Sequence, residues 1–288
     1  MATAWLLAPA LAWLAAFYIF PLAQLASVSL QSPYPGWPGY YYRDVNVGTY
    51  VHAVTQFAPH LLRSAVFASC ATLLAFTLAL PVAYVLAFRA SRYRGLIWAA
   101  VLGPYAVPFL LRTLAWRQIL ADDAPVARVL DAVGLADGRL TETAAAVVAG
   151  LAYNYYPFML IPLASALRRV DRSVIEASRD LFAGPWTTLS RVILPLAAPG
   201  IAAGCLLTFL PAAGDYVTAE LLGSRADTMA GNAIEGQMLR VVGGYPLASA
   251  TSMILLATMT LLVSAYLRRF GAAELVRGQL AADSSERS

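Results

Sequence analysis

Residues 168–199, RRVDRSVIEASRDLFAGPWTTLSRVILPLAAP, form a polar stretch between two long apolar runs. Ser173 followed by Glu176 has the spacing of a capping box, in which the two side chains satisfy backbone N–H groups at a helix start. A short helix is therefore predicted to begin there, with one small and fairly apolar face at helical spacing. That face consists of Val174, Ala177, Ser178 and Leu181.

Gly184 and Pro185 predict the end of this helix, because glycine and proline commonly follow the last helical turn. A second short helix is expected from Trp186 toward Pro195. An isolated helix this short is marginally stable in water, so its apolar face needs a docking partner. The stretch is thus predicted to be a helix-turn-helix on the membrane surface.

The runs on either side of this stretch contain no charged residue, and three further runs share that property. A helix rises about 1.5 Å per residue, so roughly 20 residues cross about 30 Å of hydrocarbon. A sixth run reaches span length if Arg112 lies near the headgroups, where a long side chain can reach water. Six membrane helices are therefore predicted, at residues 5–30, 64–88, 95–116, 143–167, 192–214 and 245–267.

The composition agrees with a membrane protein. Hydrophobic residues make up 60% of the chain and charged residues 12%, against about 25% charged in typical soluble domains. The first run lacks a basic segment before it and exceeds the apolar core of a signal peptide, so it is predicted to be a retained helix. With no visible repeat or low-complexity linker, we expect one all-α, polytopic membrane domain over residues 1–288.

All twenty basic residues are arginine. Twelve fall on the side of the 168–195 loop and eight on the opposite side, so the positive-inside rule places that loop, both termini and the tail 268–288 in the cytoplasm. Because the arginines are spread among membrane loops and form no single stripe, they indicate lipid contact and membrane topology, and no nucleic-acid partner is expected.

The absence of lysine excludes whole classes of chemistry. A P-loop needs a lysine that reaches the nucleotide phosphates, and Schiff-base catalysis needs a lysine amine. If ATP drives this protein, ATP and Mg therefore bind to another chain. His52 and His60 lie outside the predicted spans and match no metalloprotease or nucleophile-elbow motif. No catalytic residue, metal or cofactor is expected in this chain, and an intramembrane enzyme is disfavoured.

The loop resembles the signature E-A-A-x3-G-x9-I-x-L-P of permease subunits of binding-protein-dependent ABC importers. The positions that match are Glu176, Ala177, Ser178, Val192, Leu194 and Pro195. Serine and valine are mild replacements in that set, whereas Phe182 stands where the family has glycine. Because Gly184 and Pro185 would turn the chain two residues later, a slightly longer first helix and a shifted docking contact are predicted.

The resemblance implies the type I ABC importer permease fold in a bacterial inner membrane. It also implies an ATP-binding subunit dimer, a second permease subunit, homologous or identical, and an external substrate-binding protein as partners. In the family this loop inserts its short helix into a cleft on the ATP-binding subunit. The coupling residues implied here are Glu176, Ala177, Ser178, Leu181, Phe182, Gly184, Leu194 and Pro195.

The resemblance is closest to the spermidine and putrescine permease subgroup, carried by residues 112–120 (RTLAWRQIL), 152–163 (AYNYYPFMLIPL) and 214–223 (GDYVTAELLG). Related members move other small amines, amino-acid-like compounds and opines. A polycation needs carboxylates and aromatic faces along its path. The candidates are Asp215, Tyr216, Glu220, Asn154 and Tyr155.

Other interpretations of these residues stay open. Asp215 could be a helix-end carboxylate paired with an arginine, and the tyrosines could serve helix packing. Arg112 fits an interfacial anchor, or a partner for a loop carboxylate, better than a substrate ligand. The aromatic segment 31–60 suits the membrane interface or an external partner protein.

A stand-alone secondary transporter or channel is the competing function. Such proteins usually place carboxylates for ion coupling near the bilayer midplane. The five long charge-free runs contain none, so the sequence favours the importer subunit.

Overall fold

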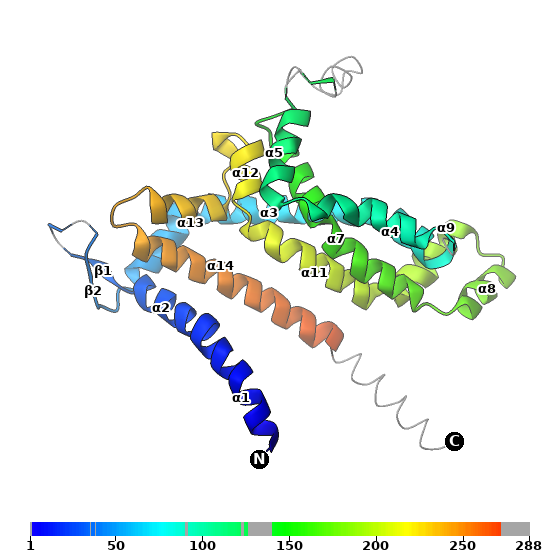
Figure 1. Cartoon of the computed structure of the whole chain (residues 1–288), viewed down its shortest axis with the longest axis horizontal. Helices are drawn as coiled ribbons and strands as arrows, with labels where there is room; N and C mark the ends of the chain where they lie inside the picture. The colour runs from blue at the N-terminus through cyan, green and yellow to red at the C-terminus, as the bar shows by residue number, and fades with distance from the viewer. Residues whose placement is uncertain are drawn as a thin grey trace.

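The computed structural model describes residues 2–34, 36, 37, 39–89, 92–121, 124, 125 and 140–271. The predicted tail beyond residue 271 and two of the arginines assigned to the outer side, at positions 128 and 139, lie outside these residues. The described chain is helical apart from one two-stranded ribbon, as the all-α prediction requires (Figure 1).

The N-terminal half contains one long helix among shorter ones. Its elements are α1 (Ala2–Leu14), which continues through a π-helical turn (Ala15–Ile19) into α2 (Phe20–Ser29), then β1 (Ser32–Pro33), β2 (Tyr41–Tyr42), α3 (Gly48–Tyr84) with a π-helical end (Val85–Arg89), α4 (Arg94–Leu102), a 3-10 turn (Gly103–Ala106) and α5 (Phe109–Ile119).

The C-terminal half has two long helices and a set of short ones around them. Its elements are α7 (Ala144–Arg168), α8 (Arg172–Asp180), α9 (Pro185–Thr188), a π-helical turn (Leu189–Ile193), α10 (Leu194–Leu196), α11 (Ala198–Gly214), α12 (Val217–Leu222), a 3-10 turn (Arg225–Asp227), α13 (Ala230–Leu239) and α14 (Tyr245–Tyr266) with a π-helical end (Leu267–Gly271).

Four stretches of the described chain are long and apolar enough to cross a membrane, and the number rises to six if each of two bent helix pairs is one span. The four are Ala8–Ser29, Gly48–Arg89, Ala144–Arg168 and Tyr245–Arg269. The bent pairs are Arg94–Ala106 with Phe109–Ile119, at 95°, and Pro185–Leu196 with Ala198–Gly214, at 74°. The prediction of six spans therefore fits only if the third and fifth are broken.

Three predicted spans differ in detail from the helices of the structure. Residues 95–116 do not form one straight helix, because Pro108 lacks a backbone donor and disfavours helical geometry at Val107, whose ψ is 137°. Residues 192–214 are likewise bent before Ala198. The helix of the second span begins earlier than residue 64, because α3 starts at Gly48 and carries Arg63, whose guanidinium donates to the carbonyl of Thr228 at 2.7 Å.

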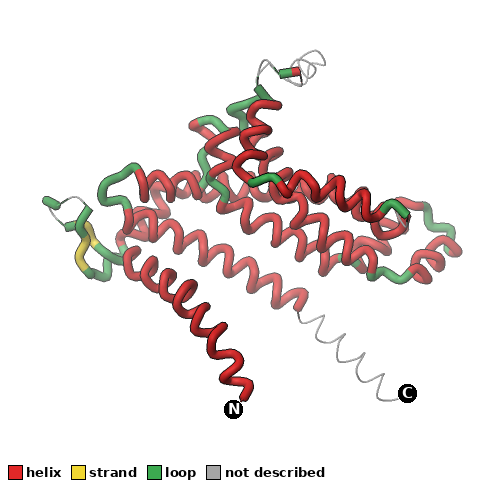
Figure 2. The backbone as a smooth tube through the Cα atoms, in the orientation of Figure 1, coloured by secondary structure: helices red, strands yellow, loops and turns green. Residues whose placement is uncertain are grey.

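Helices α3, α7, α11 and α14 lie side by side as the body of the molecule (Figure 2). Their packing depends on small residues, which let helix backbones approach closely in a bilayer. On α3 the alanines that turn inward are fully buried: Ala68, Ala71, Ala75, Ala79 and Ala83. Between α7 and α11, a Cβ added at Gly200 would overlap with the Cβ of Ala166.

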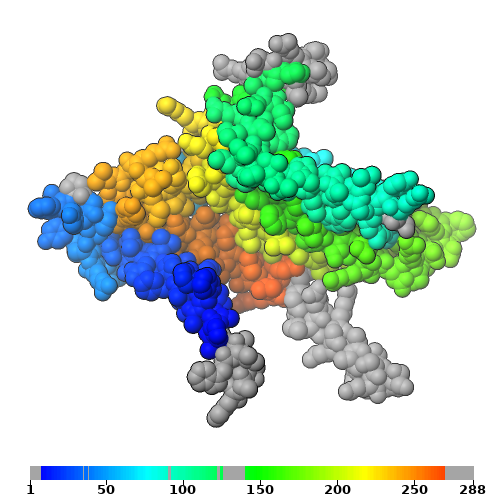
Figure 3. Space-filling view, in the orientation of Figure 1, coloured from blue at the N-terminus to red at the C-terminus, as the bar shows by residue number. Residues whose placement is uncertain are grey.

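The first helix packs on the body through α2, which contacts α14. The segment Ala8–Ser29 has none of its hydrophobic window buried inside the chain, and the side chains of Trp13 and Phe17 are each 64% exposed. In the space-filling view the blue N-terminal helix stands away from the body (Figure 3). Its apolar surface therefore has to face lipid or another chain.

The two ends of the molecule carry different structures (Figure 1). At one end, β1 and β2 pair antiparallel, Ser32 opposite Tyr42, and expose the rings of Trp37 and Tyr40. At the far end lie α8 and α9. Helices α5 and α12 contact each other and project from the side of the body between these ends.

Candidate functional site

The predicted coupling loop is a short helical hairpin, but it begins one residue earlier than expected. Asp171, in extended conformation, caps α8 by accepting a 3.0 Å hydrogen bond from the Ser173 N–H at its Oδ1. The predicted Ser173–Glu176 capping box is therefore wrong, because Ser173 already lies inside the first turn. The hydrogen bond from Ser173 also holds the pKa of the Asp171 carboxyl below its usual range.

The end of α8 also differs from the prediction. The helix stops at Asp180, and Phe182 adopts a left-handed conformation with φ of 58°. Its N–H donates to the Arg179 carbonyl at 2.8 Å, and the Ala183 N–H donates to the Ser178 carbonyl at 3.1 Å. These are the two bonds of a Schellman motif, whose left-handed position is normally glycine. The predicted later turn at Gly184 and longer helix are thus wrong, because phenylalanine takes the glycine conformation directly.

The inward face of α8 consists of Ile175 and Ser178, each 8% exposed. The Ser178 hydroxyl donates to the Ile175 carbonyl at 2.8 Å and lies 3.1 Å from the Thr188 hydroxyl of α9. The predicted apolar face is therefore divided, because Ser178 is buried whereas Val174, Ala177 and Leu181 are exposed. Ser178 joins the two short helices and is buried between them.

The outward face of the hairpin is apolar at its tip. Leu181 is 82% exposed, Phe182 98% and Trp186 76%. The remaining coupling candidates are exposed or partly exposed: Glu176, Ala177, Gly184, Leu194 and Pro195. The structure thus brings six of the eight coupling candidates onto the α8–α9 hairpin, with three exposed apolar side chains at its turn, whereas Leu194 and Pro195 lie beyond it on α10.

A second group of candidates forms a buried polar cluster where α5, α7 and α12 meet. Asp215, 6% exposed, accepts hydrogen bonds from the Tyr155 hydroxyl at 3.1 Å, the Thr218 hydroxyl at 2.6 Å and the Thr218 N–H at 3.0 Å. Asn154, 3% exposed, donates from its Nδ2 to the hydroxyls of Thr113 and Thr218 at 3.1 and 3.3 Å. Three predicted pathway residues are therefore joined, Tyr155 to Asp215 directly and Asn154 to Asp215 through Thr218, while Thr113 is a second partner of Asn154.

The sequence left open that Asp215 forms an ion pair with an arginine, and the structure shows no such pair among the described residues. Within the described ranges, the ion pairs within 4.0 Å involve Arg240 alone. The spacing from Asp215 to Thr218 is that of a helix cap, because the Asp215 carboxylate accepts the Thr218 N–H at the start of α12. That spacing could have identified Thr218 from the sequence, whereas Thr113, 41 residues from Asn154, had no comparable signal.

Aromatic rings surround the start of α5 beside this cluster. The guanidinium carbon of Arg112 lies 4.4 Å from the centroid of the Tyr105 ring, a cation–π distance. Tyr105 stacks on Tyr153 at 5.5 Å and donates from its hydroxyl to the Tyr153 carbonyl. Trp116 meets Tyr153 edge-on at 5.2 Å. Arg112 thus lies on an aromatic ring and makes no ion pair with a described carboxylate.

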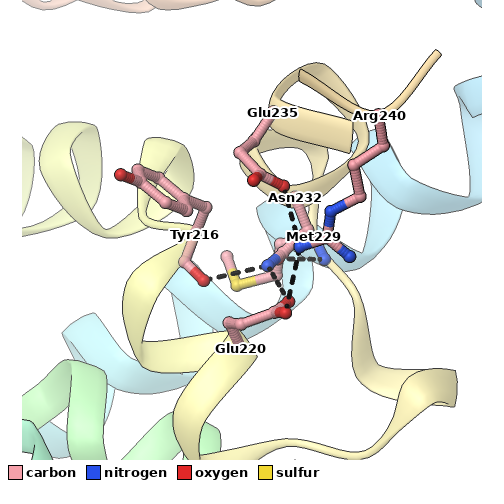
Figure 4. Close-up of polar contacts among 6 residues, drawn as sticks. All are labelled: Tyr216, Glu220, Met229, Asn232, Glu235 and Arg240. Atoms are coloured by element: carbon pink, nitrogen blue, oxygen red, sulfur yellow. Dashed lines mark hydrogen bonds and ion pairs between the residues drawn. The ribbon is translucent and has the colours of Figure 1, made fainter. Parts of the chain in front are cut away.

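The other two pathway candidates, Tyr216 and Glu220, contact residues at the two ends of α13 (Figure 4). Arg240 lies 3.3 Å from both Glu220 and Glu235, and these two carboxylates raise its pKa. Asn232 donates to Glu220 at 3.3 Å and to the Tyr216 carbonyl at 2.9 Å, so Tyr216 contributes its backbone here and not its ring. With Arg240 63% and Glu220 49% exposed, this ion pair adds little stability.

A cavity of about 320 Å³ adjoins these polar contacts, lined among others by His60, Glu220, Glu235 and Arg240. Among the described residues, no group of three histidine, cysteine, aspartate or glutamate side chains is placed to hold a metal.

Comparisons with known proteins agree on one family. Residues 75–271 match the model of the binding-protein-dependent transport system inner membrane component. The spermidine/putrescine transport system permease protein PotB of Haemophilus influenzae is 31% identical over 259 residues, which are 89% of this chain and 90% of that protein. PotB of Escherichia coli K12 is 35% identical over 210 residues, 72% of this chain and 76% of that protein.

The fold has a solved counterpart. A chain from the crystal structure of a bacterial ABC transporter involved in the import of the acidic polysaccharide alginate superposes with a TM-score of 0.69. The match covers 93% of this chain and 96% of the other, at 16% sequence identity. At that identity the likeness establishes the architecture and nothing about the substrate.

Proposed function

The chain belongs to the family of binding-protein-dependent transport system inner membrane components, and we propose that it is the importer subunit through which spermidine, putrescine or a related small amine crosses the membrane. The main support for this substrate class is the similarity to PotB, at 31% identity over nine tenths of both chains. The buried carboxylate of Asp215 supports it, because a carboxylate with no described basic partner suits a cationic substrate.

ATP and Mg would bind to a dimer of separate ATP-binding subunits, because this chain contains no lysine and hence no P-loop. Those subunits would contact the α8–α9 hairpin, whose exposed Leu181, Phe182 and Trp186 offer an apolar surface next to Glu176. Ser178 would act from inside, by keeping α8 and α9 together. Closure of the ATP-binding subunits would thereby move the helices attached to the hairpin.

The substrate path would pass the Asp215, Asn154 and Tyr155 cluster, with Tyr216 and Glu220 nearer the outer surface. A second permease subunit would complete the path and cover apolar surface that this chain leaves exposed, as on Ala8–Ser29. An external binding protein would deliver the amine at the end that carries β1 and β2. Both termini would lie in the cytoplasm with the α8–α9 hairpin, as the arginine distribution predicts.

Reconstitution tests this function directly. The chain is purified with its ATP-binding subunits, second permease and binding protein, placed in proteoliposomes, and assayed for uptake of labelled putrescine, spermidine and ornithine. We expect uptake of the two polyamines that requires both ATP and the binding protein. Uptake of ornithine alone would reassign the substrate to an amino-acid-like compound. Uptake by the chain alone, driven by an ion gradient without ATP, would contradict the importer role.

A further inference from the structure

The amide oxygen of Asn154 lies unpaired inside the membrane-spanning body. Asn154 is 3% exposed, and its Oδ1 receives no hydrogen bond from any residue that the structure describes. Its Nδ2, by contrast, has two partners, the hydroxyls of Thr113 and Thr218. A buried acceptor without a donor is unfavourable, and each such group in a native protein calls for a specific explanation.

The surrounding hydrogen bonds fix which end of the amide faces the hydroxyls. Thr113 donates its proton to the Phe109 carbonyl at 3.1 Å, and Thr218 donates its proton to Asp215 at 2.6 Å. A hydroxyl has one proton, so both oxygens present only lone pairs to Asn154, and only its NH₂ group can donate to them. Turning the amide over would place Oδ1 against those lone pairs. The unpaired oxygen is therefore imposed by the network.

Asp215 makes no ion pair with any basic residue that the structure describes. Its carboxylate accepts three hydrogen bonds, all from neutral groups of Tyr155 and Thr218. A buried carboxylate is costly in a low-dielectric region unless a cation accompanies it. Because the Thr218 hydroxyl bonds to both side chains, the Asn154 amide and the Asp215 carboxylate lie on either side of one hydroxyl.

We propose that Asn154 Oδ1 and the Asp215 carboxylate form a subsite for one primary or secondary ammonium group, with Asn154 as the residue that selects it. Such a group supplies an N–H donor to Oδ1 and a positive charge to Asp215. A quaternary ammonium has no N–H to donate, and an anion has the wrong charge, so neither satisfies both residues. The inference rests on the proposed transport of amines and adds Asn154 as the residue that accepts a hydrogen bond from the ammonium N–H.

The subsite is closed in this conformation, because both side chains are almost fully buried. Two of its walls are the short helices α5 and α12, which carry Thr113 and Thr218. A substrate therefore reaches it when one of these helices moves away from α7.

The test compares three variants of the complete importer in proteoliposomes, by ATP-driven uptake of labelled putrescine below saturation. Asn154→Leu keeps the branched shape and the number of heavy atoms but removes the acceptor together with the NH₂ donor, so uptake should fall at least about tenfold. Asn154→Asp, when protonated, keeps an acceptor oxygen at the Oδ1 position and a donor on the other oxygen. Putrescine uptake by this variant should therefore stay within about threefold of uptake by the original chain. Thr208→Val is the matched control, because Thr208 is fully buried on α11 and its Oγ1 also lacks a described partner.

Each outcome decides the matter. Full uptake by Asn154→Leu overturns the proposal, as does an equal loss in Thr208→Val, which would indicate a general cost of altering buried polar groups. If Asn154→Leu fails to co-purify with its partners, Asn154→Asp decides: uptake supports the subsite, and an assembled but inactive complex overturns it. If the unaltered importer moves no amine at all, the proposed function fails and the subsite fails with it.

Discussion

The α8–α9 hairpin and the buried polar cluster are built in opposite ways. In the hairpin, the polar contacts join residues close in sequence, such as Asp171 with Ser173 and Ser178 with Thr188. In the cluster they join residues far apart, such as Asn154 with Thr113 and Tyr155 with Asp215. The hairpin can therefore keep its shape while it moves as a unit, whereas the cluster depends on the relative positions of α5, α7 and α12.

The strongest test of this contrast is Asp215→Asn. We expect amine uptake to fall at least about tenfold, because the substitution removes the negative charge that would accompany a cation. Co-purification with the partner subunits should persist, because the amide still has an oxygen for Thr218. Asp227→Asn is the matched control, since Asp227 also accepts hydrogen bonds from a neighbouring N–H and hydroxyl, those of Ser224, but lies on the outer loop. Equal losses in both variants would remove Asp215 from the substrate path.

Gly200→Ala tests whether helix contacts hold the cluster together. The added methyl group would overlap with Ala166 and separate α11 from α7, at a cost of about 1–3 kcal/mol for an overpacked contact. A lower unfolding temperature of the purified complex, together with reduced uptake, is the expected result. Gly184→Ala in the hairpin meets no atom within 4 Å and should leave the unfolding temperature unchanged. The same decrease in both variants would show that the two regions do not differ.

Two variants at Phe182 distinguish the effect of backbone strain from the effect of side-chain contact in the hairpin. A left-handed conformation costs a non-glycine residue about 1 kcal/mol, so Phe182→Gly should stabilise the end of α8 relative to Phe182→Ala. Both variants lack the exposed ring, so both should bind the ATP-binding subunits more weakly than the original chain does. Hydrogen exchange of the α8 amides measures the first effect, and co-purification measures the second. Unchanged co-purification in both variants would mean that the ring makes no contact with those subunits.

The smallest expected effect is the pH dependence of the cap on α8. The pKa of Asp171 is lowered in the folded chain by the hydrogen bond from Ser173. The cap therefore contributes stability above the unfolded pKa of about 3.9, and this contribution is lost as pH falls through the folded value. Faster exchange of the α8 amides below about pH 4 should follow, and Asp171→Ala should abolish that change. An identical pH response in the variant would assign the effect to another group.

The sequence predicted the membrane helices better than their breaks. Absence of charge located α7 and α14 closely, because a bilayer rejects unpaired charges whatever the tertiary packing. The same criterion started the second span too late, since α3 continues past Arg63, whose guanidinium finds the carbonyl of Thr228. Pro104 and Pro108 indicated a kink in the third span, whereas the bend before Ala198 was not predicted although Pro199 was visible, because a proline can either kink a helix or start one.

What the sequence determined by itself is therefore the chemistry that each segment can support: spans where charges are absent, no phosphate-binding lysine, and a short helix in the polar loop. The tertiary structure decided the rest. It divided the five pathway candidates into a buried group and an outer group, turned Ser178 inward, and joined Asn154 to Thr113 across 41 residues. The reason is physical, because hydrogen bonds between distant residues depend on how helices pack, and packing in a bilayer follows small residues that carry no chemical label.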